Sequence, residues 1–298
     1  LLTIYINQFW SSMHGKTRKK DLYKEIKDKI RNVTDALNFT KDLSDNSNLY
    51  NAILNYGNEY WVTFTHKIRD NIKVINMLNL SQPRPLLIAI LRKFSNKEIV
   101  KSIKLILDWS IRFIVTGKLG GGAIENGYSQ LAKLVSDEKI INAVQLKKEL
   151  KISPNDKDFF RAFETLTISK AAFARYLLFT IESEINSDLG ELVPNNDPQS
   201  VNLEHILPQT FSEEWKLLYS EEDHQYLHKR LGNMTLLVAE DNNKINHSGF
   251  DAKKKVFEKS KLLITSQLKK CKQWDTKAIN DRQTEFALKA LKIWDTKI

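Results

Sequence analysis

Hydrophobic residues recur at helical spacing along most of this chain, and runs that alternate apolar with polar residues are nearly absent. In residues 20–30, for example, Leu22, Tyr23, Ile26 and Ile30 share one helical face. The same spacing predicts helices over residues 59–80, 86–93, 96–115, 128–136, 143–151, 155–163, 169–184, 252–260 and 279–294. Because strands need period-2 runs, the sequence predicts a mainly α fold.

A polar segment divides the chain. Residues 186–200 carry two prolines and are rich in Asn, Asp and Ser, which is typical of a linker. We therefore expect a helical domain over residues 1–185 and a second domain over residues 201–298. The glycines at 120–122 lack the Gly-Lys-Ser/Thr ending of a phosphate loop and are interpreted as a connection between helices.

Net charge and cysteine content restrict the possible binding partners and the cellular compartment of the protein. The formal net charge is +10, which favours polyanions such as nucleic acid through counterion release. A Lys- and Asn-rich proteome gives the same charge without any function, so charge alone leaves both explanations open. No apolar run approaches the roughly 20 residues that span a bilayer, and no membrane partner is expected. The one cysteine, Cys271, excludes an internal disulfide and suits the cytoplasm.

Two motifs carry the chemistry of the second domain. Residues 202–209 read Asn-Leu-Glu-His-Ile-Leu-Pro-Gln, and residues 231–237 read Leu-Gly-Asn-Met-Thr-Leu-Leu. Both are expected to form short antiparallel strands, followed by a helix that starts near Phe250. Neighbouring side chains of an extended strand point to opposite sides. Glu204 can then hold a metal ion while His205 faces a water molecule.

These residue types suit the hydrolysis of a phosphodiester with one metal ion. The unperturbed pKa of histidine is about 6.5, so His205 is the candidate general base. Carboxylate and amide oxygens bind hard divalent cations, so Glu204 and Asn242 are the candidate ligands of Mg²⁺ or Mn²⁺. Asn233 is expected to hydrogen-bond locally, where it either holds the base or ties the two strands together.

The two motifs, together with Asn242 nine residues after Asn233 and the later Phe250 and Lys253-Lys254, resemble a known family. They are similar to the C-terminal HNH-type nuclease domain of GmrSD-like and SspE-like modification-dependent restriction endonucleases. The first motif is also similar to the HNH module of RNA-guided CRISPR effectors.

The resemblance implies a small ββα-metal unit with C-terminal helices, and metal-dependent nicking or cleavage of phage or modified DNA. It makes His205 the general base and Asn233 the central asparagine, and it places Glu204 and Asn242 at metal-ligand positions. The family often has a further asparagine where this chain has His247, so the third metal contact stays open among Asn242, Asn246 and His247.

Related proteins also carry an N-terminal domain that senses modified DNA and hydrolyses nucleotide. Nothing in this chain matches that domain. Because residue 1 opens directly into an apolar stretch, we expect a sensor and NTPase part to lie outside this sequence.

A basic cluster follows the motifs: residues 250–298 hold 13 Lys and Arg against six Asp and Glu. The candidate contacts to DNA phosphates are Lys253, Lys254, Lys255 and Lys259, and a solvated helix face is the alternative. His224 and His228 are four residues apart like a zinc pair, but they lack further ligands and are interpreted as surface or loop histidines.

Two other functions stay open beside the nuclease. One is a DNA-binding or assembly module with a degenerate site, and the other is an RNase, since the same chemistry cuts either nucleic acid.

Overall fold

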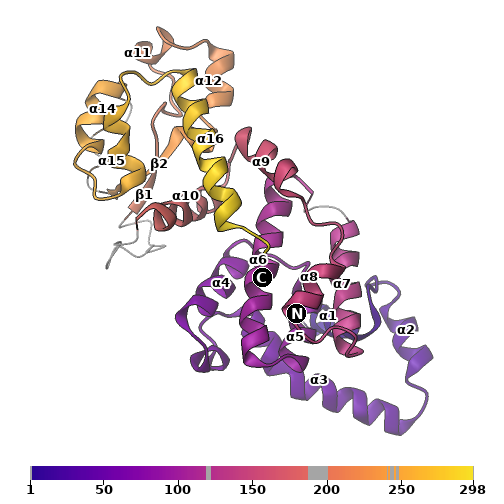
Figure 1. Ribbon diagram of the computed structural model, residues 1–298. Coiled ribbons are helices and arrows are strands. Elements are labelled where there is room, and N and C mark those ends of the chain that lie inside the picture. The colour runs from indigo at the N-terminus through magenta and orange to yellow at the C-terminus, as the bar shows by residue number, and fades with distance from the viewer. Residues whose placement is uncertain are drawn as a thin grey trace. The chain divides into compact units, whose positions relative to one another are not determined.

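The computed structural model describes residues 2–118, 122–186, 201–239, 241, 245 and 248–297. Residue contacts divide the chain into two compact units, Leu1–Pro154 with Thr296–Ile298, and Asn155–Asp295. Helices dominate both units, and the described residues contain one sheet of two strands (Figure 1). The prediction of a mainly α fold is confirmed.

The first unit is helical throughout its described part. It contains α1 (Leu2–His14), α2 (Leu22–Lys29), α3 (Val33–Leu54), the 3₁₀ turn η1 (Glu59–Thr63), α4 (His66–Met77), α5 (Arg84–Lys93), α6 (Asn96–Val115), α7 (Gly122–Ser136) and α8 (Ala143–Glu149).

Helix α5 is the centre of this unit. Its residues 86–90 are fully buried, and it packs against α1, α3, α6 and α7. Pro85 lies in its first turn, where the missing N–H costs no hydrogen bond. A helix that is apolar on all sides is stable only when neighbours cover all of it.

The second unit combines the two strands with short and long helices. It contains α9 (Asp156–Glu164), α10 (Ala171–Ile185), β1 (Val201–His205), α11 (Glu213–Lys216), α12 (Glu221–Leu227), η3 (Leu231–Asn233), β2 (Met234–Val238), α14 (Phe250–Phe257), α15 (Leu263–Ser266), η4 (Gln267–Lys270) and α16 (Thr276–Ile293).

The division between the units differs from the boundary expected within residues 186–200. Helices α9 and α10, at the start of the second unit's sequence, pack against α16 at the end of that sequence. The Phe163 ring stacks on Trp294 with a centroid distance of 6.1 Å, and the Gln283 amide donates to the Phe163 carbonyl at 2.7 Å. Residues 155–186 therefore belong with the strands. Residues 187–200 lie outside the described residues.

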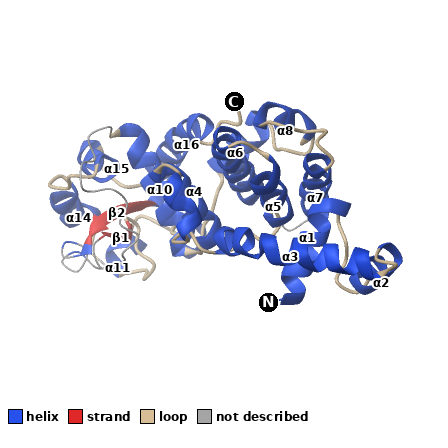
Figure 2. Ribbon diagram, turned by 90° about the horizontal axis from the view of Figure 1, so that it is seen from below, coloured by secondary structure: helices blue, strands red, loops and turns tan. Residues whose placement is uncertain are grey.

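Figure 2 shows strands β1 and β2 beside each other in red. They pair in antiparallel fashion, as the sequence predicted, with Glu204 opposite Thr235 and His205 opposite Met234. The hydrophobic core beside them includes Trp215, Trp274 and other buried residues: Ile206, Leu207, Tyr219, Leu227, Leu237, Ile245, Phe250, Phe257, Leu268 and Ile279. No helix within the described ranges is long and apolar enough to cross a membrane.

Candidate active site

The pairing of β1 with β2 directs Glu204 and His205 to opposite faces of the sheet. Glu204 lies on the face of Thr235, whose hydroxyl meets the Thr265 hydroxyl of α15 at 2.8 Å. His205 lies on the face of Leu203 and Met234, since side chains two residues apart on a strand share one side. Adjacent residues thus face two separate environments, as the sequence predicted for an extended segment.

Glu204 is paired with a lysine of α14. The Lys253 ammonium donates to Oε1 of Glu204 at 2.5 Å and to the His205 carbonyl at 2.8 Å. Lys253 is fully buried and Glu204 is 7 % exposed. Burial lowers the pKa of Lys253, and the nearby Glu204 carboxylate opposes that shift. Lys253, one of the expected DNA contacts, therefore points into the protein and neutralises a buried carboxylate.

His205 is a neutral imidazole at neutral pH. Burial, together with the charges of His228 and Lys253, lowers its pKa to about 4. The Gln209 side-chain amide donates to Nε2 of His205 at 3.3 Å, which leaves the ring hydrogen on Nδ1. The lone pair that a general base needs is therefore on Nε2, where it accepts from Gln209, so Gln209 has to release this nitrogen before His205 can take up a proton.

Asn233 is fully buried and ties several backbone segments together. Its Oδ1 accepts from the Leu207 amide at 2.8 Å and from the Trp274 indole at 2.9 Å. Its Nδ2 donates to the carbonyls of Leu207 at 2.9 Å and His228 at 3.3 Å. Its amide thus fixes the residues after His205, the end of α12 and the approach to α16.

His224 of α12 and His228 at the C-terminal end of this helix are more buried than the surface or loop positions that the sequence indicated. His224 is 7 % exposed, contacts the Pro208 carbonyl through Nε2 at 2.8 Å, and stacks on Phe211. His228 stacks on His224 at 5.0 Å and lines a cavity together with His205. The two sequence motifs do not contain His228. The sequence feature that could have pointed to it is its spacing of four residues from His224.

The remaining expected DNA contacts lie on or after α14. The Lys254 ammonium donates to the Cys271 carbonyl at 2.6 Å, whereas Lys255 and Lys259 are exposed.

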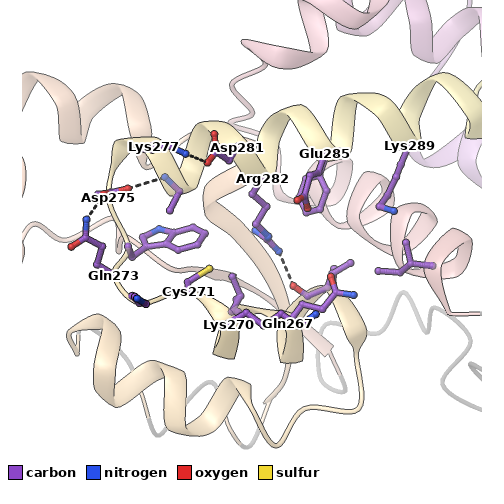
Figure 3. Close-up of a pocket in the computed structure, with 17 residues that line it drawn as sticks. Gln267, Lys270, Cys271, Gln273, Asp275, Lys277, Asp281, Arg282, Glu285 and Lys289 are labelled. Carbon is purple, nitrogen blue, oxygen red and sulfur yellow. Dashed lines mark hydrogen bonds and ion pairs between the residues drawn. The ribbon is translucent and has the colours of Figure 1, made fainter.

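A pocket of about 760 Å³ lies beside Cys271, between α16 and the η4 segment (Figure 3). Its cationic lining residues are Lys270, Lys272, Lys277, Arg282 and Lys289. Figure 3 shows the Arg282 side chain extending away from α16. Its guanidinium donates to the Ile264 carbonyl at 2.9 Å. Three acidic residues also line the pocket, so its charge is mixed with a cationic excess.

Most of the expected metal ligands lie outside the described residues. These are Asn242, Asn246 and His247, and only Glu204 is described. Among the described residues, no three His, Cys, Asp or Glu side chains are grouped so that they could hold a metal ion. Glu204 itself fits the chemistry of a cation site, because this buried carboxylate is stabilised by a positive charge, here that of Lys253.

Comparison with known proteins identifies the second unit. Residues 153–289 match the family model described as "GmrSD restriction endonucleases, C-terminal domain". The match begins two residues before the second unit and covers both strands, α14 and most of α16. No curated protein matched the chain. The segment that carries Glu204 and His205 is therefore similar to the C-terminal domain of GmrSD restriction endonucleases.

Proposed function

We propose that this protein is a metal-dependent DNA endonuclease of the HNH type, which nicks DNA in a prokaryotic anti-phage restriction system. The observation that carries the proposal is the family match over the unit in which Glu204 and His205 adjoin on β1. We take β1, β2 and α14 as the ββα-metal unit of such an enzyme. We also propose a cytoplasmic setting, where such an enzyme meets incoming DNA.

His205 is the general base in this proposal. It removes a proton from the water whose oxygen attacks the phosphorus, the bond from phosphorus to the leaving sugar oxygen breaks, and that oxygen takes up a proton from solvent to become a hydroxyl group. Its pKa of about 4 keeps the ring neutral at neutral pH, and it also makes the ring a weaker base than an imidazole with a pKa near 7. Asn233 positions the base indirectly, because it fixes the backbone on the C-terminal side of His205.

The proposed metal is Mg²⁺ or Mn²⁺, held by Glu204 with Asn242 and with His247 or Asn246. When bound, it would polarise the phosphate and lower the pKa of the attacking water. A hard cation suits the carboxylate and amide oxygens of this set, and His247 would add a nitrogen ligand. A cation at Glu204 takes over the charge that Lys253 supplies, so we expect the Glu204–Lys253 pair to loosen when the metal binds.

A plasmid assay tests the proposal. Supercoiled DNA is incubated with the protein and Mg²⁺, Mn²⁺ or chelator, beside the His205→Ala variant. We expect metal-dependent nicking by the original protein and a loss of at least about 100-fold in the variant, the scale of a general-base contribution. His66→Ala is the matched control, because His66 is exposed on α4 of the first unit.

Full activity of a pure His205→Ala preparation would contradict the assignment of the base. Structured RNA is tested in parallel, and preferential cleavage of RNA would favour the RNase function.

The second candidate function is a DNA-binding or assembly module with an inactive site. The Glu204–Lys253 ion pair favours it, because an ammonium group already occupies the carboxylate expected to hold the metal. Salt-sensitive DNA binding without cleavage under any metal condition would support this candidate.

A further inference from the structure

The first unit carries a strongly basic segment, outside the residues that match the restriction endonuclease family. Residues 16–31 hold eight Lys and Arg against three Asp and Glu, whereas the family match begins at residue 153. Helix α2 forms the middle of this segment, and Figures 1 and 2 both show it at the outer edge of the first unit. The exposed cationic residues are Arg18, Lys19, Lys20, Lys24, Lys27, Lys29 and Arg31.

Three of these lysines share one face of the helix. Lys20 lies in the turn that leads into α2, and Lys24 and Lys27 follow it at intervals of four and three residues. Side chains at this spacing are neighbours on a helix surface. Tyr23 lies on the same face, three residues after Lys20 and four before Lys27, and it is 76 % exposed. We call Lys20, Tyr23, Lys24 and Lys27 the α2 basic face.

The other side of α2 attaches the helix to the first unit. Leu22 is buried there, and Ile26 is half-buried. Oε2 of Glu25 accepts hydrogen bonds from the buried Trp10 indole at 3.1 Å and from the buried Thr17 hydroxyl at 2.7 Å. The carboxylate of α2 that has hydrogen-bond partners in the unit therefore points inward, and the ammonium groups point to solvent.

The lysines of the α2 basic face have no acidic partner among the described ion pairs, none of which includes Lys20, Lys24 or Lys27. Of the nearby acids, Asp21 pairs at 2.6 Å with the arginine three residues before it, and Asp28 is exposed. Like charges three and four residues apart destabilise a helix. A bound polyanion would remove this repulsion.

A general excess of lysine along the chain does not explain the α2 basic face. Helix α3 follows directly and is also exposed over much of its length. It contains one lysine, Lys41, against three acids, Asp35, Asp42 and Asp45. The positive charge is therefore concentrated on α2 and is not a property of every exposed helix in this unit.

We propose that the α2 basic face binds the phosphate backbone of duplex DNA. This inference rests on the proposed nuclease function, which makes DNA the polyanion that the protein meets. It adds a DNA contact in a different unit from the one that carries Glu204 and His205. Lysine ammonium groups and tyrosine hydroxyls both donate to phosphate oxygens, and such contacts carry no sequence information. The face therefore holds DNA of any sequence.

Binding is measured without cleavage. The full chain is titrated in chelator into a short labelled duplex at several salt concentrations, and the fluorescence anisotropy is followed. The key variant is Lys20→Gln/Lys24→Gln/Lys27→Gln, because glutamine removes the charge and has a similar helix propensity. The slope of log affinity against log salt should fall in magnitude by about 2.7 when each lysine neutralises one phosphate. At about 0.1 M salt the Kd should rise at least roughly tenfold.

A matched control removes the same charge elsewhere. Lys97→Gln/Lys148→Gln/Lys151→Gln changes three lysines that are exposed on other parts of the first unit, and it should leave the Kd within about twofold of the original. Equal losses in the two triple variants would overturn the inference, because net charge alone would then account for binding. Unchanged DNA affinity in the α2 variant would also overturn it, even when the same variant binds phosphatidylserine vesicles less tightly.

The outcomes separate this inference from the proposed function. A protein that nicks DNA, and whose α2 variant binds duplex as tightly as the original, would contradict the α2 contact and leave the nuclease proposal intact. Where nicking occurs, the α2 variant should raise KM and leave kcat unchanged, since its three lysines lie outside the unit that carries His205. A selective loss of duplex binding in a protein that cuts no nucleic acid would support the α2 contact and overturn the nuclease proposal.

Discussion

At the scale of single residues, the ion pair of Glu204 and Lys253 has the largest energetic consequence. Both side chains are buried, and removing one partner of such a pair leaves an uncompensated charge in a medium that solvates it poorly. The same pair lies where the proposed metal binds. Stability measurements on Lys253 variants therefore report on the metal site as well as on the fold.

Lys253→Met is expected to lower the free energy of unfolding by about 3–5 kcal/mol, because it removes the ammonium group that pairs with the buried Glu204 carboxylate. Denaturant unfolding followed by circular dichroism measures the loss. The double variant Glu204→Gln/Lys253→Met has no buried charge at this position and is expected to lose less than the single variant.

The same variant tests the metal. If Glu204 binds Mg²⁺ or Mn²⁺, either ion should raise the Tm of Lys253→Met more than that of the original protein, since the cation replaces the missing ammonium. An equal effect of the ions on both proteins would argue against a cation at Glu204.

The sequence revealed Glu204, His205 and Asn233 because each lies in a contiguous motif. It did not reveal that Lys253 turns inward, because an amphipathic helix such as α14 carries lysines on several faces and only packing decides which one is covered. His228 was missed for a related reason. Its importance comes from a shared cavity with His205, 23 positions away in the sequence.

At the scale of elements, α16 supports the site through its contacts with η3 and the start of β2. Gly232 of η3 packs so closely on α16 that an added Cβ would lie 2.5 Å from the Ile279 carbonyl. Arg282 of the same helix donates to the carbonyls of Gly232 and Met234, each at 2.7 Å. The start of β2 is thus held directly by α16, and the stability of this helix supports the geometry at His205.

Asp275 is the N-cap of α16, and its carboxylate accepts from the Ala278 amide at 2.8 Å. Asp275→Ala is expected to destabilise the protein by about 1 kcal/mol in denaturant unfolding at neutral pH. Asp275→Asn keeps a capping oxygen and is the matched control. A loss in the Asn variant as large as in the Ala variant would argue against capping.

This cap also predicts a pH dependence. The Ala278 hydrogen bond lowers the pKa of Asp275 below its usual 3.8. The ionised form is therefore favoured in the folded state, and the stability it adds is present above about pH 4. It is lost as the pH falls through the folded pKa. Unfolding measured at pH 7 and near pH 3 should show the difference between the original protein and Asp275→Asn shrinking at the lower pH.

The strands were predictable from sequence although few period-2 runs exist, because the motifs placed them. Some helices were not. The sequence suggested one helix over residues 59–80, whereas the structure has η1 and then α4 from His66, because the Trp61 indole turns back to the Ala52 carbonyl. Helix α3 was not predicted from the sequence, because much of its surface is exposed and the helical spacing of its apolar residues is weak.

At the scale of the whole molecule, the division at residues 154 and 155 has a direct test. A fragment of residues 155–298 retains α9 and α10, which cover α16, and is expected to unfold cooperatively on heating. A fragment of residues 201–298 lacks Phe163 and Tyr176, which contact Trp294 and Gln283, and is expected to show no cooperative transition. Cooperative unfolding of the shorter fragment would instead support a boundary within residues 186–200.

Charge distribution gives a second prediction at this scale. Lys270 and Lys272 are exposed beside the pocket of Figure 3, and the double change to Glu is expected to weaken DNA binding. The slope of log affinity against log salt should fall by roughly 0.9 for each DNA phosphate that the variant no longer neutralises. Lys148 and Lys151, exposed in the first unit, give the matched control. Equal effects of both pairs would indicate attraction by net charge alone.

The opposite directions of Glu204 and His205 make this protein sensitive to chain length within β1. Deleting one residue between positions 201 and 203 would slip the strand by one position against β2. Such a slip turns every side chain of the shifted strand to the other side. The imidazole would then lie against α14, and the carboxylate would enter the space beside α10. We therefore expect insertions and deletions to be excluded from the strand itself.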